Sequence, residues 1–277
     1  MPTRPPLRPP LRKALGQHHL TQGALCRPLV DFLRPAGRTV VEVGPGGGVL
    51  TRELLNAGAD PLVAWELDLA WAAELARRAK SWQQPVRGAP GPPGHLQLVL
   101  GDALEIPWRL LPTDTRVAGN LPYNVATQII QRLLPAWEQI SRAGFLVQWE
   151  VAERLVARPG DSAYGALSVL VAAYAKPRLL ARVKRGSFRP PPKVDGAFVG
   201  IELQEPPLPE TDMPGFVRTV HLAFGQRRKT LANALAAGWG KEKAREVVAA
   251  AGLDPKVRAE ALGLEELLRV WELAEGS

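Results

Sequence analysis

The sequence predicts an α/β domain built on a largely parallel sheet, followed by a smaller helical domain. Two observations favour this order. Strand-like runs alternate with helical patterns through the first 204 residues, an order typical of βαβ units. A linker with four prolines, at 205–214, then precedes a stretch in which every periodic segment is helical.

The composition is that of an ordinary globular protein. The chain has 277 residues, of which 46% are hydrophobic and 22% charged. No apolar run approaches membrane-spanning length, and the N-terminus lacks the apolar segment of a signal peptide. We therefore expect a cytoplasmic protein with no membrane partner. Cys26 is the only cysteine, which excludes intrachain disulfide frameworks and cysteine-based zinc sites.

Basic charge is concentrated in two stretches. The net charge of +8 and the sequence pI near 10.0 favour a polyanionic partner. Residues 1–12 hold five prolines, three arginines and no acid, so we expect a disordered basic arm. Residues 176–193 carry seven Lys or Arg, no acid, and Phe188 among them. An aromatic ring among basic side chains can stack a base while the charges hold phosphates.

The first strand–turn–helix unit has the pattern of a nucleotide-binding site. A β-rich run at 39–43 leads into the glycine turn 44–48, and a helical pattern follows at 49–57. Glycines there let the backbone approach a ligand closely. The next strand, 61–65, is followed by Glu66, 22 residues after the first glycine, where an acid can accept both hydroxyls of a ribose. From these residues alone, NAD and S-adenosylmethionine fit almost equally well.

Two later strands end in polar residues that belong at the same edge of the sheet. The strand at 96–100 is followed by Asp102, which could accept a hydrogen bond from an adenine amino group or cap a helix. The strand at 116–119 ends in Asn120-Leu121-Pro122-Tyr123. The Asn side chain and nearby carbonyls can accept from an amino group, and Tyr123 can stack on a base. A simple strand-ending turn is the alternative.

The remaining periodic segments complete the two domains. In the first we expect further strands at 145–148 and 197–203, a surface loop at 85–94, and helices at 25–33, 69–81, 127–134, 150–157 and 167–174. In the second we expect helices at 215–224, 229–237, 241–250 and 265–274. The expected domains are 13–204 and 215–277.

With these motifs in order, the chain resembles the rRNA adenine N6,N6-dimethyltransferase family, and within it the small-subunit branch. The resemblance covers residues 13–235. Its motifs are Gly16-Gln17…Leu20, Glu42-Val43-Gly44-Pro45-Gly46, Glu66-Leu67-Asp68, Gly101-Asp102-Ala103, Gly119-Asn120-Leu121-Pro122-Tyr123-Asn124, Phe188…Lys193-Val194-Asp195 and Phe224…Arg227-Arg228-Lys229. The glycine turn is shared by many nucleotide enzymes, but the other motifs in this order are specific.

The resemblance implies a Rossmann-like S-adenosylmethionine-dependent methyltransferase domain with a small α-helical C-terminal domain. The implied reaction is dimethylation of two adjacent adenosines near the 3′ end of 16S rRNA in the immature small ribosomal subunit, and we expect a monomer. The implied cofactor-binding residues are His18, Leu20, Gly44, Gly46, Glu66, Asp102 and Asn120. The implied catalytic residues are Asn120, Leu121, Pro122, Tyr123 and Phe188.

We further expect the C-terminal domain to bind RNA. Two basic clusters are expected to hold RNA phosphates. The first, in the domain 13–204, is Lys184, Arg185, Arg189 and Lys193 around Phe188, and the second is Arg227, Arg228 and Lys229 at the start of a C-terminal helix.

The chain departs from the resembled family at three positions. The family usually has Asn then Phe where this chain has His18 and His19, and Lys where it has Trp149. The two histidines have no Cys or nearby acid beside them, so we expect no metal site. Three other functions remain open: a large-subunit rRNA adenine methyltransferase of the macrolide-resistance type, a non-catalytic ribosome-assembly factor on this fold, and an NAD-dependent oxidoreductase.

Overall fold

The computed structural model describes residues 9, 18–82, 95–122, 125–226 and 228–275, and every structural statement below concerns these residues. The chain divides into two compact units, Met1–Ala152 with Arg178–Leu203, and Glu153–Pro177 with Gln204–Ser277. The second unit therefore includes Glu153–Pro177, a segment that the sequence-based boundaries placed in the first domain. The expected loop at 85–94 and nearly all of the expected arm at 1–12 lie outside the described residues.

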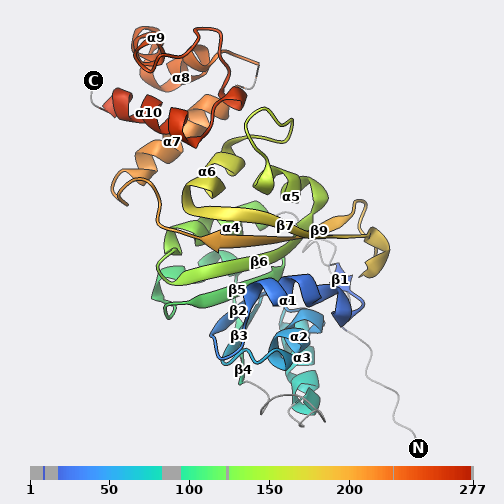
Figure 1. The fold of residues 1–277 in the computed structure, drawn as a ribbon. Coiled ribbons are helices and arrows are strands. Elements are labelled where there is room, and N and C mark those ends of the chain that lie inside the picture. Colours follow the sequence, from blue (N-terminus) through green and yellow to red (C-terminus); the bar gives the residue numbers. More distant parts are fainter. Residues whose placement is uncertain (1–8, 10–17, 83–94, 123–124, 227, 276–277) are drawn as a thin grey trace, which may run out of the picture. The chain divides into compact units, whose positions relative to one another are not determined.

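A seven-stranded sheet forms the centre of the first unit, in the order β4-β3-β2-β5-β6-β9-β7 (Figure 1). Neighbouring strands from β4 to β6 run parallel, and β9 is antiparallel to β6. The carboxyl ends of the parallel strands therefore meet at one edge, here called the carboxyl edge. The strands are β2 (Val40–Val43), β3 (Leu62–Glu66), β4 (Leu96–Leu100), β5 (Thr115–Asn120), β6 (Ile140–Gln148), β7 (Ala175–Val183) and β9 (Gly196–Leu203).

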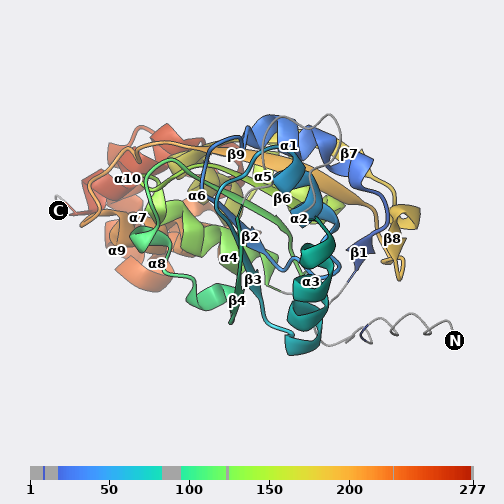
Figure 2. The same cartoon turned by 90° about the horizontal axis from the view of Figure 1, so that it is seen from below.

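Helices cover both faces of this sheet. Figure 2 shows α1 (Arg27–Leu33), α2 (Val49–Asn56) and α3 (Leu69–Trp82) on one side and α4 (Ala126–Leu133) on the other. A further helix, α5 (Trp149–Val156), follows β6 directly. Covering both faces explains why β2 is buried along its whole length.

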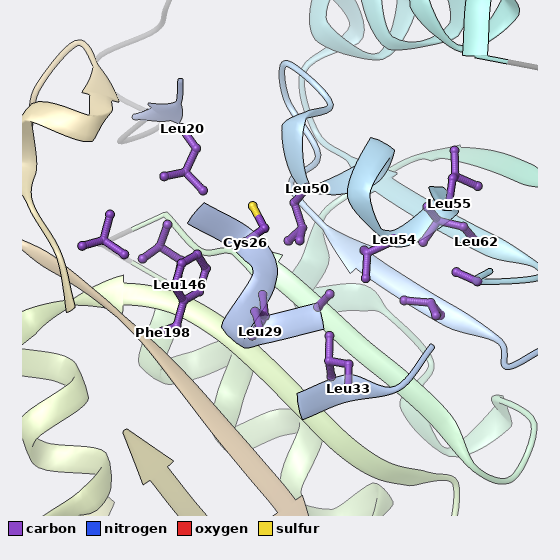
Figure 3. Packing of buried hydrophobic residues seen from close by; sticks show 14 of the residues in the cluster. Leu20, Cys26, Leu29, Leu33, Leu50, Leu54, Leu55, Leu62, Leu146 and Phe198 are labelled. Atoms are coloured by element: carbon purple, nitrogen blue, oxygen red, sulfur yellow. The ribbon is translucent and has the colours of Figure 1, made fainter. Parts of the chain in front are cut away.

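A core of aliphatic side chains fixes α1 and α2 on the sheet. Leucines of the two helices, Leu29, Leu33, Leu50 and Leu54, are buried against strand residues (Figure 3). Burial of each such side chain contributes roughly 1.5–3 kcal/mol. The helix α1 can approach β6 closely because Gly144 has no side chain: a Cβ there would lie 2.4 Å from Cδ1 of Leu29.

A second, two-stranded sheet joins segments far apart in the sequence. Strand β1 (His19–Leu20) pairs antiparallel with β8 (Phe188–Arg189), with Leu20 opposite Phe188. The backbone N–H and the hydroxyl of Thr21 both donate to the carbonyl of Ser187, at 3.0 and 3.1 Å. We call this pair of strands the cover strands.

The second unit is helical. It contains α6 (Ala166–Tyr174), α7 (Met213–Phe224), α8 (Leu231–Trp239), α9 (Lys241–Ala250) and α10 (Leu264–Glu275). The buried hydroxyl of Tyr164 donates to the carbonyl of Leu262 at 2.8 Å, and its ring meets that of Phe224 edge-on at 5.7 Å. Burial raises the pKa of Tyr164 to about 12. These contacts explain why the segment before α6 belongs with the C-terminal helices.

The predicted fold class is confirmed, and the predicted strands and helices correspond to observed elements with slightly different ends, except that β6, predicted from residue 145, begins at Ile140. The helix predicted from residue 229 begins at Leu231, after Thr230 as its N-cap. Strands β1, β7 and β8 were not predicted. In the part of the chain that the structure describes, no helix combines the length and the apolar character needed to cross a bilayer.

Candidate active site at the carboxyl edge

A cavity of about 170 Å³ opens at the carboxyl edge of the first unit. The ends of β2, β3, β4 and β5 contribute to its lining, together with the segment that leads into β1. The predicted residues that line it are His18, Leu20, Gly44, Gly46, Glu66, Asp102, Asn120, Leu121 and Pro122. The structure thus brings together all the predicted cofactor-binding residues and the described part of the Asn120 motif.

The glycine turn between β2 and α2 requires glycine at specific positions. Gly44 and Gly46 have φ values of 64° and 47°, in the left-handed region where a side chain is strained. Space is also limiting at Gly46, because a Cβ there would lie 2.3 Å from Cε1 of His19. The turn therefore presents bare backbone to the cavity.

Glu66 connects the end of β3 to this turn. Its carboxylate accepts the backbone N–H of Gly46 through Oε2 and that of Asp68 through Oε1, both at 2.9 Å. Burial raises the pKa of Glu66, whereas these two hydrogen bonds oppose the rise. Each carboxylate oxygen has a further lone pair, so Glu66 can still accept from a ligand's hydroxyls.

Asp102 caps a short helix, one of the two roles that its sequence position suggested, and it also lies at the cavity. Its Oδ1 accepts the backbone N–H of Leu104 at 2.9 Å and so caps the short 3₁₀ helix Ala103–Glu105. The residue also lines the cavity. Its contact with a cofactor remains a prediction.

Glu42 is a cavity residue that the sequence analysis quoted only as part of a motif. It lies in β2 with 1% of its surface exposed, and its Oε2 is buried without a hydrogen-bond partner among the described residues. Burial raises the pKa of Glu42 to about 8, and the charge of Glu66 adds to the rise. The available signal was a single acid within an otherwise apolar strand, which is costly unless the acid has a function.

The Asn120 side chain is held in one orientation. Its Nδ2 donates to the carbonyl of His18 at 2.7 Å, which leaves Oδ1 as the acceptor for a ligand. The buried Leu121 donates its N–H to the carbonyl of Leu146 at 3.0 Å. The carbonyl of Pro122 accepts from Val125 and Ala126 at the start of α4. Tyr123 lies outside the described residues.

The two adjacent histidines have different contacts. The ring of His18 donates from Nδ1 to the carbonyl of Pro190, the residue directly after β8, at 2.8 Å. The ring of His19 accepts the N–H of Gly47 through Nδ1 at 3.2 Å and stacks on Trp71, with centroids 4.4 Å apart. No role for His19 was predicted from the sequence. Among the described residues, no group of three or more His, Cys, Asp or Glu is arranged to hold a metal ion.

Phe188 does not line the cavity. Only 2% of its surface is exposed, and it belongs to the buried cluster with Leu20, Leu146 and Phe198. Stacking of a base on its ring stays a prediction and requires the ring to become exposed.

The predicted phosphate-binding residues that the structure describes are all exposed: Lys184, Arg185, Arg189, Lys193, Arg228 and Lys229. Arg227 lies outside the described residues. The first four belong to the first unit and the last two to the second. Their contacts with RNA remain predictions.

Comparison with known proteins identifies the family. A family model described as ribosomal RNA adenine dimethylase matches residues 10–275. The chain is 40% identical over 253 residues to ribosomal RNA small subunit methyltransferase A of Thiobacillus denitrificans, covering 91% of this chain and 92% of that protein.

Solved structures share the fold. A dimethyladenosine transferase from Plasmodium falciparum has the same fold, with a TM-score of 0.74, 22% identity, and coverage of 91% and 96% of the two chains. The 23S rRNA methyltransferase ErmE gives a TM-score of 0.65, 26% identity, and coverage of 92% of this chain and 99% of ErmE. The chain therefore belongs to the ribosomal RNA adenine dimethylase family.

Proposed function

We propose that this protein transfers methyl groups from S-adenosylmethionine to the N6 atoms of two adjacent adenosines near the 3′ end of small-subunit rRNA, in the immature subunit. The main support for the proposal is the Asn120 side chain, which lines a cavity with cofactor-binding features and is oriented by its bond to His18 so that Oδ1 can accept a hydrogen bond from N6. The chain is an S-adenosylmethionine-dependent rRNA adenine dimethyltransferase by family. That it acts as a cytoplasmic monomer is part of the proposal.

The residues present fit S-adenosylmethionine. This cofactor carries a sulfonium and an ammonium, and three carboxyl groups, Glu42, Glu66 and Asp102, line the cavity. Oε2 of Glu42 is a buried polar atom without a hydrogen-bond partner among the described residues, so it is available to a polar group of the cofactor. In this proposal Glu66 holds the ribose hydroxyls and Asp102 the adenine amino group. When bound, the cofactor supplies a methyl group activated by positive sulfur.

The chain's own contribution follows from the electronics of adenine. The N6 lone pair is delocalised into the ring, so the amino group is a poor nucleophile. Oδ1 of Asn120 and the carbonyl of Leu121 can accept the N6 hydrogens and so favour a pyramidal nitrogen whose lone pair is directed at the methyl group. Because Nδ2 of Asn120 already donates to His18, this acceptor needs no reorganisation during the reaction. No covalent enzyme intermediate is required.

A second candidate is methylation of large-subunit rRNA, which the likeness to ErmE supports. The relative from T. denitrificans, which is 40% identical, is instead named for the small subunit, so we favour the small-subunit target. The two candidates share their chemistry and differ only in the rRNA that carries the product.

One experiment separates these targets. The protein is incubated with labelled S-adenosylmethionine and with either immature small subunits or protein-free large-subunit rRNA. Nucleosides are then identified by mass spectrometry. We expect N6,N6-dimethyladenosine in small-subunit rRNA only. Product confined to large-subunit rRNA would favour the second candidate, and light scattering tests the monomer.

A further inference from the structure

Three residues from different strand ends meet at the carboxyl edge, beside the strand that ends in Asn120. Trp149 directly follows β6, whose Leu146 pairs with Asn120. Asp195 directly precedes β9, and Arg182 is the penultimate residue of β7. The backbone N–H of Trp149 donates to the carbonyl of Asp195 at 3.0 Å, which joins the first two segments.

The guanidinium of Arg182 is held in a fixed plane by the other two residues. Its Nε and Nη2 lie 3.0 and 2.9 Å from Oδ2 of Asp195, so one side chain anchors two of its nitrogens. Its Cζ lies over the ring of Trp149 at 4.5 Å from the centroid. Asp195 is itself fixed, because Oδ1 accepts the backbone N–H of Arg185 at 3.0 Å.

This arrangement leaves the guanidinium accessible. The Arg182 side chain is 59% exposed although Trp149 lies beneath it. The other arginine over an aromatic ring in the described residues, Arg142 over Phe32, is 21% exposed and donates to the Phe32 carbonyl. A flat, exposed guanidinium backed by an indole is a surface on which a nucleobase can stack.

We propose that Arg182, supported by Trp149 and Asp195, is a stacking platform for an unpaired base of the rRNA substrate that flanks the target adenosines. This inference rests on the proposed function for the identity of the RNA. Trp149, the residue under the guanidinium, lies three residues after the Leu146 that pairs with Asn120, so the platform is on the same edge of the sheet as the proposed site of methyl transfer. Arg182 binds substrate here, and Trp149 and Asp195 are positioning residues.

Arg178 offers a matched control on the same strand. It lies four residues earlier, so its side chain leaves the same face of β7. It is 62% exposed and pairs with Glu202 through one nitrogen at 3.3 Å, with no aromatic ring beneath it among the contacts of the described residues. A role that depends on charge alone would be shared by the two arginines.

The first test measures binding of a small-subunit rRNA fragment that contains the two target adenosines. Arg182→Lys keeps the charge but removes the planar group, whereas Arg178→Lys makes the same change without a platform. We expect Arg182→Lys to weaken binding at least about fivefold, the lower limit for loss of one stacked base, without changing the salt dependence. Arg178→Lys should stay within about twofold of the wild type. Equal effects of the two changes would overturn the proposal.

The second test locates the base. Each unpaired nucleotide flanking the target adenosines is replaced in turn by an abasic site. At one position, the wild type should bind the abasic RNA about fivefold more weakly than it binds the intact RNA. The Arg182→Lys variant should bind that abasic RNA and the intact RNA equally well. Additive losses at every position would mean that Arg182 stacks on no base, and the proposal would fail.

Three further measurements test the role of Asp195, the folding of the variants and the proposed function. Asp195→Asn, which loosens the guanidinium without removing it, should produce part of the Arg182→Lys loss at the same nucleotide, and thermal unfolding verifies that each variant is folded. The nucleosides that the wild type produces are analysed in a separate experiment. If Arg182 is coupled to one base but no dimethyladenosine forms, the proposed function is rejected and the platform stands. If dimethyladenosine forms but Arg182 is coupled to no base, the proposed function stands and the platform is rejected.

Discussion

The hydrogen bonds on the glycine-turn side of the cavity and those around the cover strands join residues at very different separations in the sequence. On the first side, Glu66 binds the N–H of Gly46, 20 residues away. On the second, Thr21 binds Ser187 across 166 residues and His18 binds Pro190 across 172. Asn120 joins the two sides through His18, 102 residues away. The glycine-turn side, here called the cofactor side because it contains Gly44, Gly46, Glu66 and Asp102, is thus a local property of βαβ units, whereas the side formed by the cover strands depends on the complete fold of the first unit.

The largest effect that we expect concerns Phe188, the residue of β8 that packs on β1. Because Phe188 is 2% exposed, Phe188→Ala should lower the free energy of unfolding by about 3–5 kcal/mol, the usual cost of deleting a core ring. Urea denaturation measures this change. The control, Leu110→Ala, removes a side chain that is 82% exposed and should change stability by less than about 0.5 kcal/mol. If the two changes cost equally little, the cover strands are not part of the core.

Asn120→Ala tests the residue that connects the two sides. It should reduce the single-turnover rate of methyl transfer at saturating cofactor by roughly 10²–10³, the usual loss for one preorganised polar group. The exposed Asn56 at the end of α2 gives the control variant Asn56→Ala, with an expected rate within twofold of the wild type. An unchanged rate for Asn120→Ala would remove its side chain from the mechanism.

Sequence patterns predicted the cofactor side of the site in detail. The glycine turn and Asp102 follow strands, and Glu66 and Asn120 end them. Because parallel strands place their carboxyl ends together, this convergence could be foreseen. The cover strands could not, because two-residue strands lack periodicity and their partners are remote. For the same reason the burial of Phe188 was not predicted: its sequence neighbours are basic, and it is buried through the pairing of β8 with the remote β1.

Glu42 is a buried acid on the cofactor side of the cavity. Its pKa is raised from 4.5 to about 8, so the folded state keeps a proton that the unfolded chain loses above about pH 4.5. The contribution to stability is therefore complete below that pH and is lost as the pH rises towards about 8. Between about pH 5 and 7 the loss should be roughly 2–3 kcal/mol, from 1.36 kcal/mol per pKa unit.

Glu42→Gln should remove this component of the pH dependence. Denaturant unfolding at several pH values, without cofactor, measures it. The control is Glu138→Gln, which changes an exposed acid and should keep the wild-type slope. A Glu42→Gln variant with the same slope as the wild type would show that Glu42 is ionised in the folded protein.

Glu66→Ala tests the cofactor side directly. Loss of a charged acceptor for the ribose hydroxyls should weaken S-adenosylmethionine binding by about 1.5–3 kcal/mol, measured by calorimetry. Glu105→Ala removes an exposed acid from the short helix after Asp102 and should leave the affinity unchanged. Wild-type affinity in Glu66→Ala would mean that Glu66 only supports Gly46 and Asp68.

The smallest effects belong to the exposed charges of the second unit. Arg228 and Lys229 precede α8, are exposed, and form no ion pair with the residues described by the structure. If both hold rRNA phosphates, each change to Ala should flatten the salt dependence of RNA binding by about one unit of slope, because one fewer counterion is released.

The control is Lys241→Ala, an exposed charge at the start of α9 in the same unit, which should keep the wild-type slope. S-adenosylmethionine affinity should not change in any of the three, since the cavity residues all belong to the first unit. Equal slopes for Arg228→Ala, Lys229→Ala and the wild type would assign the phosphate contacts to the first unit alone, and the basic residues before α8 would then be ordinary solvated charges.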